Sequence, residues 1–83
     1  MAIERKEIEQ VLYEVVGKVF SRDVSTITPE LKWKEDLNVK SVHGMKVCAT
    51  LNYKFGIKLP VSKLIDCETI GDAVSMLDEF INN

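Results

Sequence analysis

The chain of 83 residues is 46% hydrophobic and 29% charged, with a formal net charge of −2. A chain this short supports one hydrophobic core, so we expect a single domain over residues 1–83, without the deep cleft of a self-sufficient enzyme. The composition is not that of a disordered protein, and no apolar run approaches the roughly 18 residues of a membrane span, which argues against membrane insertion.

The first predicted element is an amphipathic helix over residues 3–21. Its apolar residues follow one another at alternating spacings of three and one, which places them on one helical face: Ile8, Val11, Leu12, Val15, Val16, Val19 and Phe20. Acidic residues at Glu4, Glu7 and Glu9 suit the positive end of the helix dipole.

Residues 22–40 break this pattern and predict a long first loop rich in turn formers such as Asp23, Thr28 and Pro29. A loop of this length must pack on the body of the domain or carry function. Its apolar residues are the expected anchors: Ile27, Leu31, Trp33 and Leu37. We interpret Trp33 as a lid over a pair of helices.

A second helix is predicted to start near Ser41 and to end before Gly56, a residue suited to a left-handed helix end. Its inner face is ambiguous, because several alternatives fit helical spacing: Val42, Met45, Cys48 or Ala49, Leu51 or Asn52, and Phe55. A short helix over residues 61–65 follows Pro60.

The last predicted helix begins at Thr69-Ile70-Gly71-Asp72, where a hydroxyl three residues before an acid resembles a capping box. One apolar face follows: Ile70, Ala73, Val74, Leu77 and Ile81. No segment alternates with period two, so we expect an all-α four-helix bundle with three longer helices, one short helix and a long first loop.

Ser41 stands at the junction between the loop and the second helix. Its simplest role is an N-cap, because serine hydroxyls accept hydrogen bonds from backbone N–H groups there. A phosphate ester on the same hydroxyl would also be favoured, since helix N-termini attract anions, and Lys40 adds a cation beside it.

Three ordered motifs decide between these interpretations. Thr28–Glu30 (TPE) with Glu35–Val42 (EDLNVKSV), Phe55–Pro60 (FGIKLP) and Thr69–Val74 (TIGDAV) resemble the TPE, EDLGxDSL, FGIxIP and TVGDAV segments of acyl carrier proteins. The resemblance covers essentially the whole chain and keeps the family's spacing from the serine onward. It implies a four-helix bundle of the acyl carrier protein type.

The resemblance also implies a function. In that family a phosphopantetheinyl transferase attaches 4'-phosphopantetheine from coenzyme A to the motif serine, which corresponds to Ser41. The arm then carries acyl, polyketide or aminoacyl groups as thioesters, and the carrier itself is not an enzyme. The family resemblance favours a monomer. We expect the bundle to shelter an apolar chain in a pocket lined by Val42, Met45, Ala49, Leu59, Leu64 and Ile70.

The sequence departs from the family around the serine, where Lys40 replaces the usual aspartate, Val42 a leucine and Asn38 a glycine. Residues 37–65 contain five lysines and no acid, whereas residues 66–83 contain five acids and no base. The resemblance implies that partner enzymes of this family dock through basic patches. Because like charges slow association, ordinary fatty-acid synthesis enzymes should dock poorly on this lysine-rich segment. We expect a specialised carrier whose acyl-loading and acyl-processing partners have acidic docking faces and contact Lys40, Val42, His43, Lys46 and Lys54.

Gly44 interrupts this helix and has two interpretations, either room for the arm or a partner, or a tolerated surface glycine. Cys48 and Cys67 form no CxxC pair, and one histidine completes no zinc spacing, so we expect free thiols and no metal site. These thiols and the charged N-terminal residues, which lack the apolar stretch of a signal peptide, are typical of a cytoplasmic protein.

Three other functions compete with the carrier. The first is a non-carrier interaction module that keeps the bundle and docks through the lysine-bearing second helix. A hydrolase using Ser41, His43 and Asp36 is disfavoured, because residues two apart near a helix start point to different faces. Nucleic-acid binding is also disfavoured, because the lysines come without arginine or interleaved aromatics.

Overall fold

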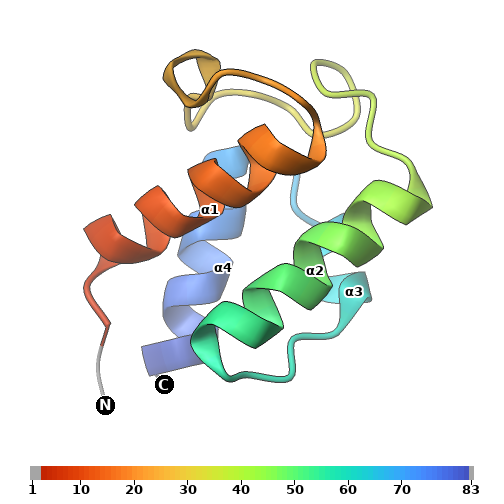
Figure 1. Cartoon of the computed structure of the whole chain (residues 1–83). Coiled ribbons are helices and arrows are strands. Elements are labelled where there is room, and N and C mark those ends of the chain that lie inside the picture. Colours follow the sequence, from red (N-terminus) through yellow and green to blue (C-terminus); the bar gives the residue numbers. More distant parts are fainter. Residues whose placement is uncertain (1–2, 83) are drawn as a thin grey trace.

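The computed structural model describes residues 3–82, in which four α-helices and one turn of 3₁₀ helix pack together (Figure 1). The elements are α1 (Arg5–Val19), η1 (Val24–Thr26), α2 (Ser41–Phe55), α3 (Val61–Ile65) and α4 (Ile70–Asn82). The first loop crosses one end of the bundle from α1 to α2 (Figure 1). The expected all-α architecture of three longer helices and one short helix is confirmed. Within residues 3–82, no helix is long and apolar enough to cross a membrane.

Most helix boundaries agree with the sequence patterns. α2 begins at Ser41 and ends at Gly56, whose φ of 64° is the predicted left-handed conformation. The capping box of α4 is present, because Asp72 N–H donates to Thr69 Oγ1 at 3.1 Å and Thr69 N–H to Asp72 Oδ2 at 3.3 Å. α1 is shorter than expected, since the chain leaves the helix at Phe20 and Ser21 turns left-handed, with a φ of 55°.

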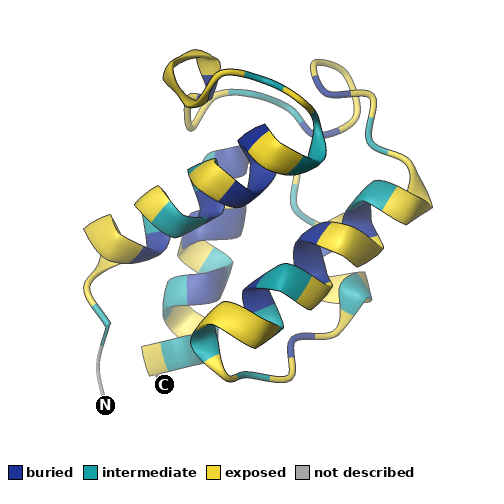
Figure 2. Cartoon of the chain, viewed as in Figure 1, coloured by how far each residue is buried: buried dark blue, intermediate teal, exposed yellow. Residues whose placement is uncertain are grey.

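The core draws on every α-helix and on the first loop (Figure 2). Its buried side chains form one contiguous cluster: Ile8, Leu12, Val15, Val16, Ile27, Trp33, Leu37, Val47, Cys48, Leu51, Leu59, Leu64, Ile70, Ala73, Val74 and Leu77. Burial of such a cluster is the main favourable term in folding. The apolar faces predicted for α1 and α4 supply about half of its members.

Asn52 attaches the segment between α2 and α3 to α2. Its side-chain oxygen accepts a hydrogen bond from Leu59 N–H at 2.8 Å, and its side-chain amide donates to Leu59 O at 3.3 Å. The Cys48 thiol donates to the same carbonyl at 2.9 Å. These contacts satisfy backbone groups of a buried residue and fix where α3 starts relative to α2.

The first loop is held against the start of α4 by backbone pairing. Ile70 N–H donates to Leu31 O at 2.9 Å, and Gly71 N–H donates to Pro29 O at 2.9 Å. Next to these two contacts, Lys32 and Thr69 form an isolated antiparallel bridge. The loop is therefore structured along the stretch that leads to Ser41.

Trp33 is the principal anchor of this loop. Its side chain is only 3% exposed, and its indole N–H donates to Thr69 O at 3.0 Å. Its backbone N–H donates to Glu68 O at 3.1 Å, while its carbonyl accepts from Val39 N–H at 2.9 Å. The buried, hydrogen-bonded ring agrees with the expected lid.

Two glycines inside helices give a matched test of packing. A Cβ at Gly17 would lie 2.9 Å from the backbone oxygen of Arg22, whereas a Cβ at Gly44 would meet Ile65 Cγ1 at an ordinary 3.7 Å. Both changes to alanine gain about 1 kcal/mol of helix propensity. At Gly17 the clash outweighs that gain, so we expect a net loss of about 1–2 kcal/mol for Gly17→Ala and a gain for Gly44→Ala. Urea denaturation of the two variants measures these changes in the free energy of unfolding. Equal changes in the two variants would refute the prediction.

Asn38 adopts a left-handed conformation, with a φ of 51°, three residues before Ser41. Asparagine and glycine tolerate this region, whereas a β-branched side chain does not. We expect Asn38→Gly to leave the midpoint of urea denaturation nearly unchanged and Asn38→Val to cost about 1–2 kcal/mol. A valine variant as stable as the wild type would contradict the left-handed turn.

Candidate functional site

Ser41 is the first residue of α2 and is exposed to solvent. The N-cap is the preceding residue, Lys40, whose extended backbone has φ −108° and ψ 167°. The expectation that Ser41 itself serves as the N-cap is therefore wrong by one residue. This shift matters, because the Ser41 hydroxyl is not used to cap the helix and remains accessible to a modifying enzyme.

His43 partly caps the start of α2. Lys40 N–H donates to His43 Nδ1 at 3.0 Å, and the imidazole packs on Phe20 with ring centroids 4.6 Å apart. Only half of a capping box is present, because a lysine side chain has no acceptor for the reciprocal bond. The half-buried imidazole thus joins the start of α2 to the end of α1, an internal role that sequence analysis did not predict.

A phosphodiester on Ser41 fits these surroundings. The backbone N–H groups of the first helical turn have no partner within an α-helix, and the helix dipole places positive charge at this end. Lys40 is exposed beside the serine and carries a further positive charge. The N-terminal residues of α2 therefore suit a covalently attached phosphate-containing group on grounds of both charge and access.

The structure does not assemble a hydrolytic triad from the residues considered above. Asp36 accepts a hydrogen bond from Lys32 N–H at 2.9 Å through its Oδ2 atom. His43 Nδ1, the nitrogen that an orienting carboxylate would contact, already accepts from Lys40 N–H. The two candidate partners of Ser41 therefore have other hydrogen-bonding roles.

Neither cysteine has the properties of an activated nucleophile. Burial raises the pKa of the Cys48 thiol, and burial together with Asp72 and Asp66 raises the pKa of Cys67 from 9.0 to about 11. A raised pKa leaves less thiolate at neutral pH. Both cysteines are free thiols, as expected, and Cys48 packs in the core.

The expected lining of an acyl pocket is partly wrong. Val42 is 52% exposed, Met45 is 59% exposed, and Ala49 is also exposed, so these three side chains point away from the core. The buried face of α2 consists of Gly44, Val47, Cys48 and Leu51, and at 100° per residue the expected residues lie on the opposite side. Leu59, Leu64 and Ile70 are core residues, at 3%, 3% and 0% exposure.

The exposed face of α2 carries an apolar row, which we call the outer stripe: Val42, Met45, Ala49 and Tyr53. Tyr53 is 88% exposed, and sequence analysis gave it no role. In Figure 2, exposed stretches alternate with half-buried and buried ones along α2. An exposed row of large apolar side chains on one helix is the kind of feature that marks interaction sites.

Lysines flank the outer stripe. Lys46 and Lys54 are exposed on α2, and Lys18 of α1 lines shallow surface grooves with each of them. The ion pairs found within residues 3–82 join Arg5 to Asp78, and Lys32 to Glu35 and Glu68. The lysines of α2 are in none of these pairs, so the acidic C-terminal segment does not neutralise them by direct contact. Lys18 is a member of this basic surface that sequence analysis missed.

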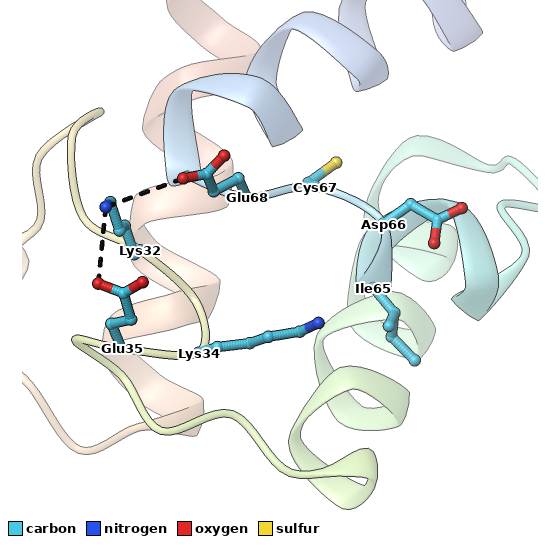
Figure 3. Close-up of a pocket in the computed structure, with 7 residues that line it drawn as sticks. All are labelled: Lys32, Lys34, Glu35, Ile65, Asp66, Cys67 and Glu68. Atoms are coloured by element: carbon cyan, nitrogen blue, oxygen red, sulfur yellow. Dashed lines mark ion pairs between the residues drawn. The ribbon is translucent and has the colours of Figure 1, made fainter.

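Two recesses lie between the first loop and α3. The smaller, which we call the α2–α3 cleft, is almost entirely apolar and is lined by Trp33, Val39, Gly44, Leu64 and Ile65. The larger has a volume of about 300 Å³ and is mostly charged, with Lys32 paired to Glu35 and Glu68 on one side and the ammonium group of Lys34 reaching toward Ile65 (Figure 3). Of the residues predicted from the sequence to line an acyl pocket, only Leu64 lines the small cleft.

Known proteins resemble this chain over nearly its whole length. Residues 10–77 match the family model described as the phosphopantetheine attachment site. An acyl carrier protein of Acidothermus cellulolyticus is 31% identical over 93% of this chain and 92% of its own length. The meromycolate extension acyl carrier protein of Mycobacterium leprae is 29% identical over 95% of this chain and 69% of its own.

The fold agrees with these sequence matches. The solved structure of an acyl carrier protein from Enterococcus faecalis superimposes with a TM-score of 0.74 and 26% identity, covering 93% of this chain and 98% of the other. Family model, sequence relatives and fold all agree with a start of α2 suited to a phosphate ester. The chain therefore belongs to the acyl carrier protein family, whose members carry acyl groups on a covalently attached 4'-phosphopantetheine.

Proposed function

We propose that Ser41 is the residue that carries the phosphopantetheine arm. Ser41 is exposed at the start of α2, outside the cap that Lys40 and His43 form. The resemblance of residues 35–42 to the family's motif makes Ser41 the counterpart of the motif serine. A phosphopantetheinyl transferase acts on this hydroxyl, and the terminal thiol of the arm then holds the acyl cargo as a thioester. The chain's own residues present the serine and bind the phosphate, and the protein is a carrier without enzymatic activity of its own.

Several wider features belong to the same proposal. We propose that residues 1–83 act as one carrier domain, because the buried residues form a single cluster. Monomeric behaviour and a cytoplasmic location stay predictions, the latter supported by two free cysteines. The alternative of a non-carrier interaction module is not favoured, because the family model describes a phosphopantetheine attachment site.

The attachment proposal is tested by intact mass after incubation with coenzyme A, magnesium and a broad-specificity phosphopantetheinyl transferase. We expect the wild type to gain one phosphopantetheine and Ser41→Ala to gain none. Ser62→Ala is the matched control, because Ser62 is an exposed serine in the first turn of α3. This control should be modified like the wild type. Modification of Ser41→Ala would contradict the assignment.

We further propose that partner enzymes dock on the outer stripe and its flanking lysines. Aromatic side chains that become buried on binding supply much of the binding energy in many interfaces. Tyr53 is the highly exposed aromatic side chain of this helix and is suited to that role. The complementary partner surface is an apolar groove bordered by carboxylates. Lys40, Lys46 and Lys54 supply the basic side, while Val42 contributes apolar contact near the arm. His43 contributes only the part of its ring that remains accessible.

This electrostatic arrangement predicts a preference among enzymes. Because Lys46 and Lys54 are exposed and have no acidic partner within the described residues, they should repel a transferase whose docking face is basic. Replacing both by glutamate should raise kcat/KM for such a transferase by about tenfold at low salt. Raising the salt concentration should reduce the difference in kcat/KM between the double variant and the wild type, because salt screens exposed charges.

The control is a pair of equal charge changes outside the proposed face, Lys6→Glu with Lys63→Glu, since both lysines are exposed on other helices. We expect this pair to change kcat/KM much less. If both pairs raise the rate equally, net charge rather than the face of α2 determines recognition, and the docking proposal fails.

A further inference from the structure

Three aromatic rings from three elements meet at the start of α2, and we call them the aromatic row. Trp33 belongs to the first loop, Phe20 follows the last residue of α1, and His43 lies in the first turn of α2. The ring centroids of Phe20 and Trp33 are 6.3 Å apart, and those of Phe20 and His43 are 4.6 Å apart. These separations are typical of interacting rings, so the row connects the first loop, the end of α1 and the start of α2.

The two residues before Ser41 are both hydrogen-bonded to members of this row. Val39 N–H donates to the carbonyl of Trp33 at 2.9 Å, and Lys40 N–H donates to His43 Nδ1 at 3.0 Å. The two bonds start from consecutive residues and end at opposite ends of the row. The path of the backbone into Ser41 is therefore fixed by contacts with these aromatic residues.

The start of α2 is poorly capped apart from the bond to His43. Lys40 occupies the N-cap position, where its side chain makes no capping hydrogen bond, because an ammonium group can only donate. Residues that are preferred there, such as serine or aspartate, accept a bond from the first turn. The start of α4 has both bonds of the capping box, between Thr69 and Asp72. Order at the start of α2 therefore depends more heavily on one side chain.

The first turn of α2 is held from two sides. On one side, the imidazole of His43 packs on Phe20 at the end of α1. On the other, Gly44 is buried, which contradicts its interpretation as a surface glycine, and a Cβ there would lie 3.7 Å from Ile65 and 3.9 Å from Val61 of α3. Contacts on both sides restrict movement of this turn, and the contact with α1 depends on the imidazole.

The position of the Ser41 hydroxyl follows from the order of this turn. Ser41 is exposed and its hydroxyl does not cap the helix, so the backbone on either side of it determines where the hydroxyl lies. A frayed helix end would place the hydroxyl correctly in only a fraction of molecules. Because apparent affinity falls in proportion to the fraction that is competent to bind, an ordered turn favours the complex with a modifying enzyme.

We propose that His43 is a positioning residue for the attachment of the arm. In that reaction the serine Oγ bonds to the phosphorus next to pantetheine, the bond between the two phosphates of coenzyme A breaks, and adenosine bisphosphate leaves, while the hydroxyl proton passes to the transferase. His43 touches none of these atoms. It binds Lys40 N–H and packs on Phe20, and in this way fixes the turn that presents Ser41. This inference rests on the proposal that Ser41 carries the arm.

The first test is steady-state kinetics of the unmodified protein with a broad-specificity phosphopantetheinyl transferase, coenzyme A and magnesium. We expect His43→Ala to raise KM about fivefold with little change in kcat, because loss of the cap lowers the competent fraction. His43→Gln should keep KM within about twofold of the wild type, because glutamine at this position accepts a bond from the N-cap N–H. A wild-type KM in His43→Ala, or the same increase in both variants, would overturn the proposal.

Thr69→Ala is the matched control for stability. Its hydroxyl accepts the N–H of Asp72, so its removal also takes away one bond of a helix cap without changing the charge of the protein. We expect Thr69→Ala and His43→Ala to have similar midpoints of urea denaturation, but only His43→Ala to raise KM. If the two variants raise KM equally, His43 acts only through overall stability, and the positioning role is wrong.

Amide hydrogen exchange followed by NMR tests the contact in the absence of the transferase. Lys40 N–H should exchange several-fold faster in His43→Ala than in the wild type, and His43→Gln should retain most of the protection. Phe20→Leu should also accelerate this exchange, because the imidazole loses the ring on which it packs. If KM rises in His43→Ala while the exchange of Lys40 N–H is unchanged, His43 contacts the transferase directly and the positioning role is refuted.

The two proposals fail in different ways. If the wild type gains no phosphopantetheine, the attachment proposal fails, and the positioning role fails with it. If the wild type is modified and His43→Ala is modified with the same KM, only the positioning role fails.

Discussion

Trp33 joins the first loop to the junction of α3 and α4 through hydrogen bonds to Glu68 and Thr69. Its carbonyl accepts a hydrogen bond from Val39 N–H, which holds the last residues before Ser41 in place. Fixing a loop of this length has a large entropic cost, which the buried indole and its satisfied polar groups offset. The same residue lines the α2–α3 cleft. The course of the loop toward the serine and the lining of the recess beside it therefore involve the same side chain.

α2 has two faces with different roles. Its buried face, with Gly44, Val47 and Leu51, holds the bundle together. Its exposed face presents an apolar row bordered by lysines that are in none of the ion pairs found within residues 3–82. Ser41 stands where this exposed face meets the first loop. Because the proposed attachment site and the proposed docking face share one helix, a partner bound to the outer stripe would lie close to the arm without any change in the bundle.

Much of the fold was predictable from the sequence. The strong apolar periodicity of α1 and α4, the cap at Thr69 and the helix-ending Gly56 gave the element order and most boundaries. The inner face of α2 was not predictable, because residues 42, 45 and 49 fit helical spacing as well as 44, 47, 48 and 51 do, and Gly44 does not count as apolar. The role of His43 depends on its contact with Phe20, which only the tertiary structure brings near.

The most direct test of the account is tandem mass spectrometry of the protein purified from its own source. Trypsin cleaves after Lys40 and Lys46, so Ser41 lies alone among serines in the peptide of residues 41–46. The account predicts that this peptide carries phosphopantetheine at Ser41, alone or with an acyl group on the thiol. An unmodified peptide throughout, or the same group on Ser62 or Ser75 instead, would contradict it.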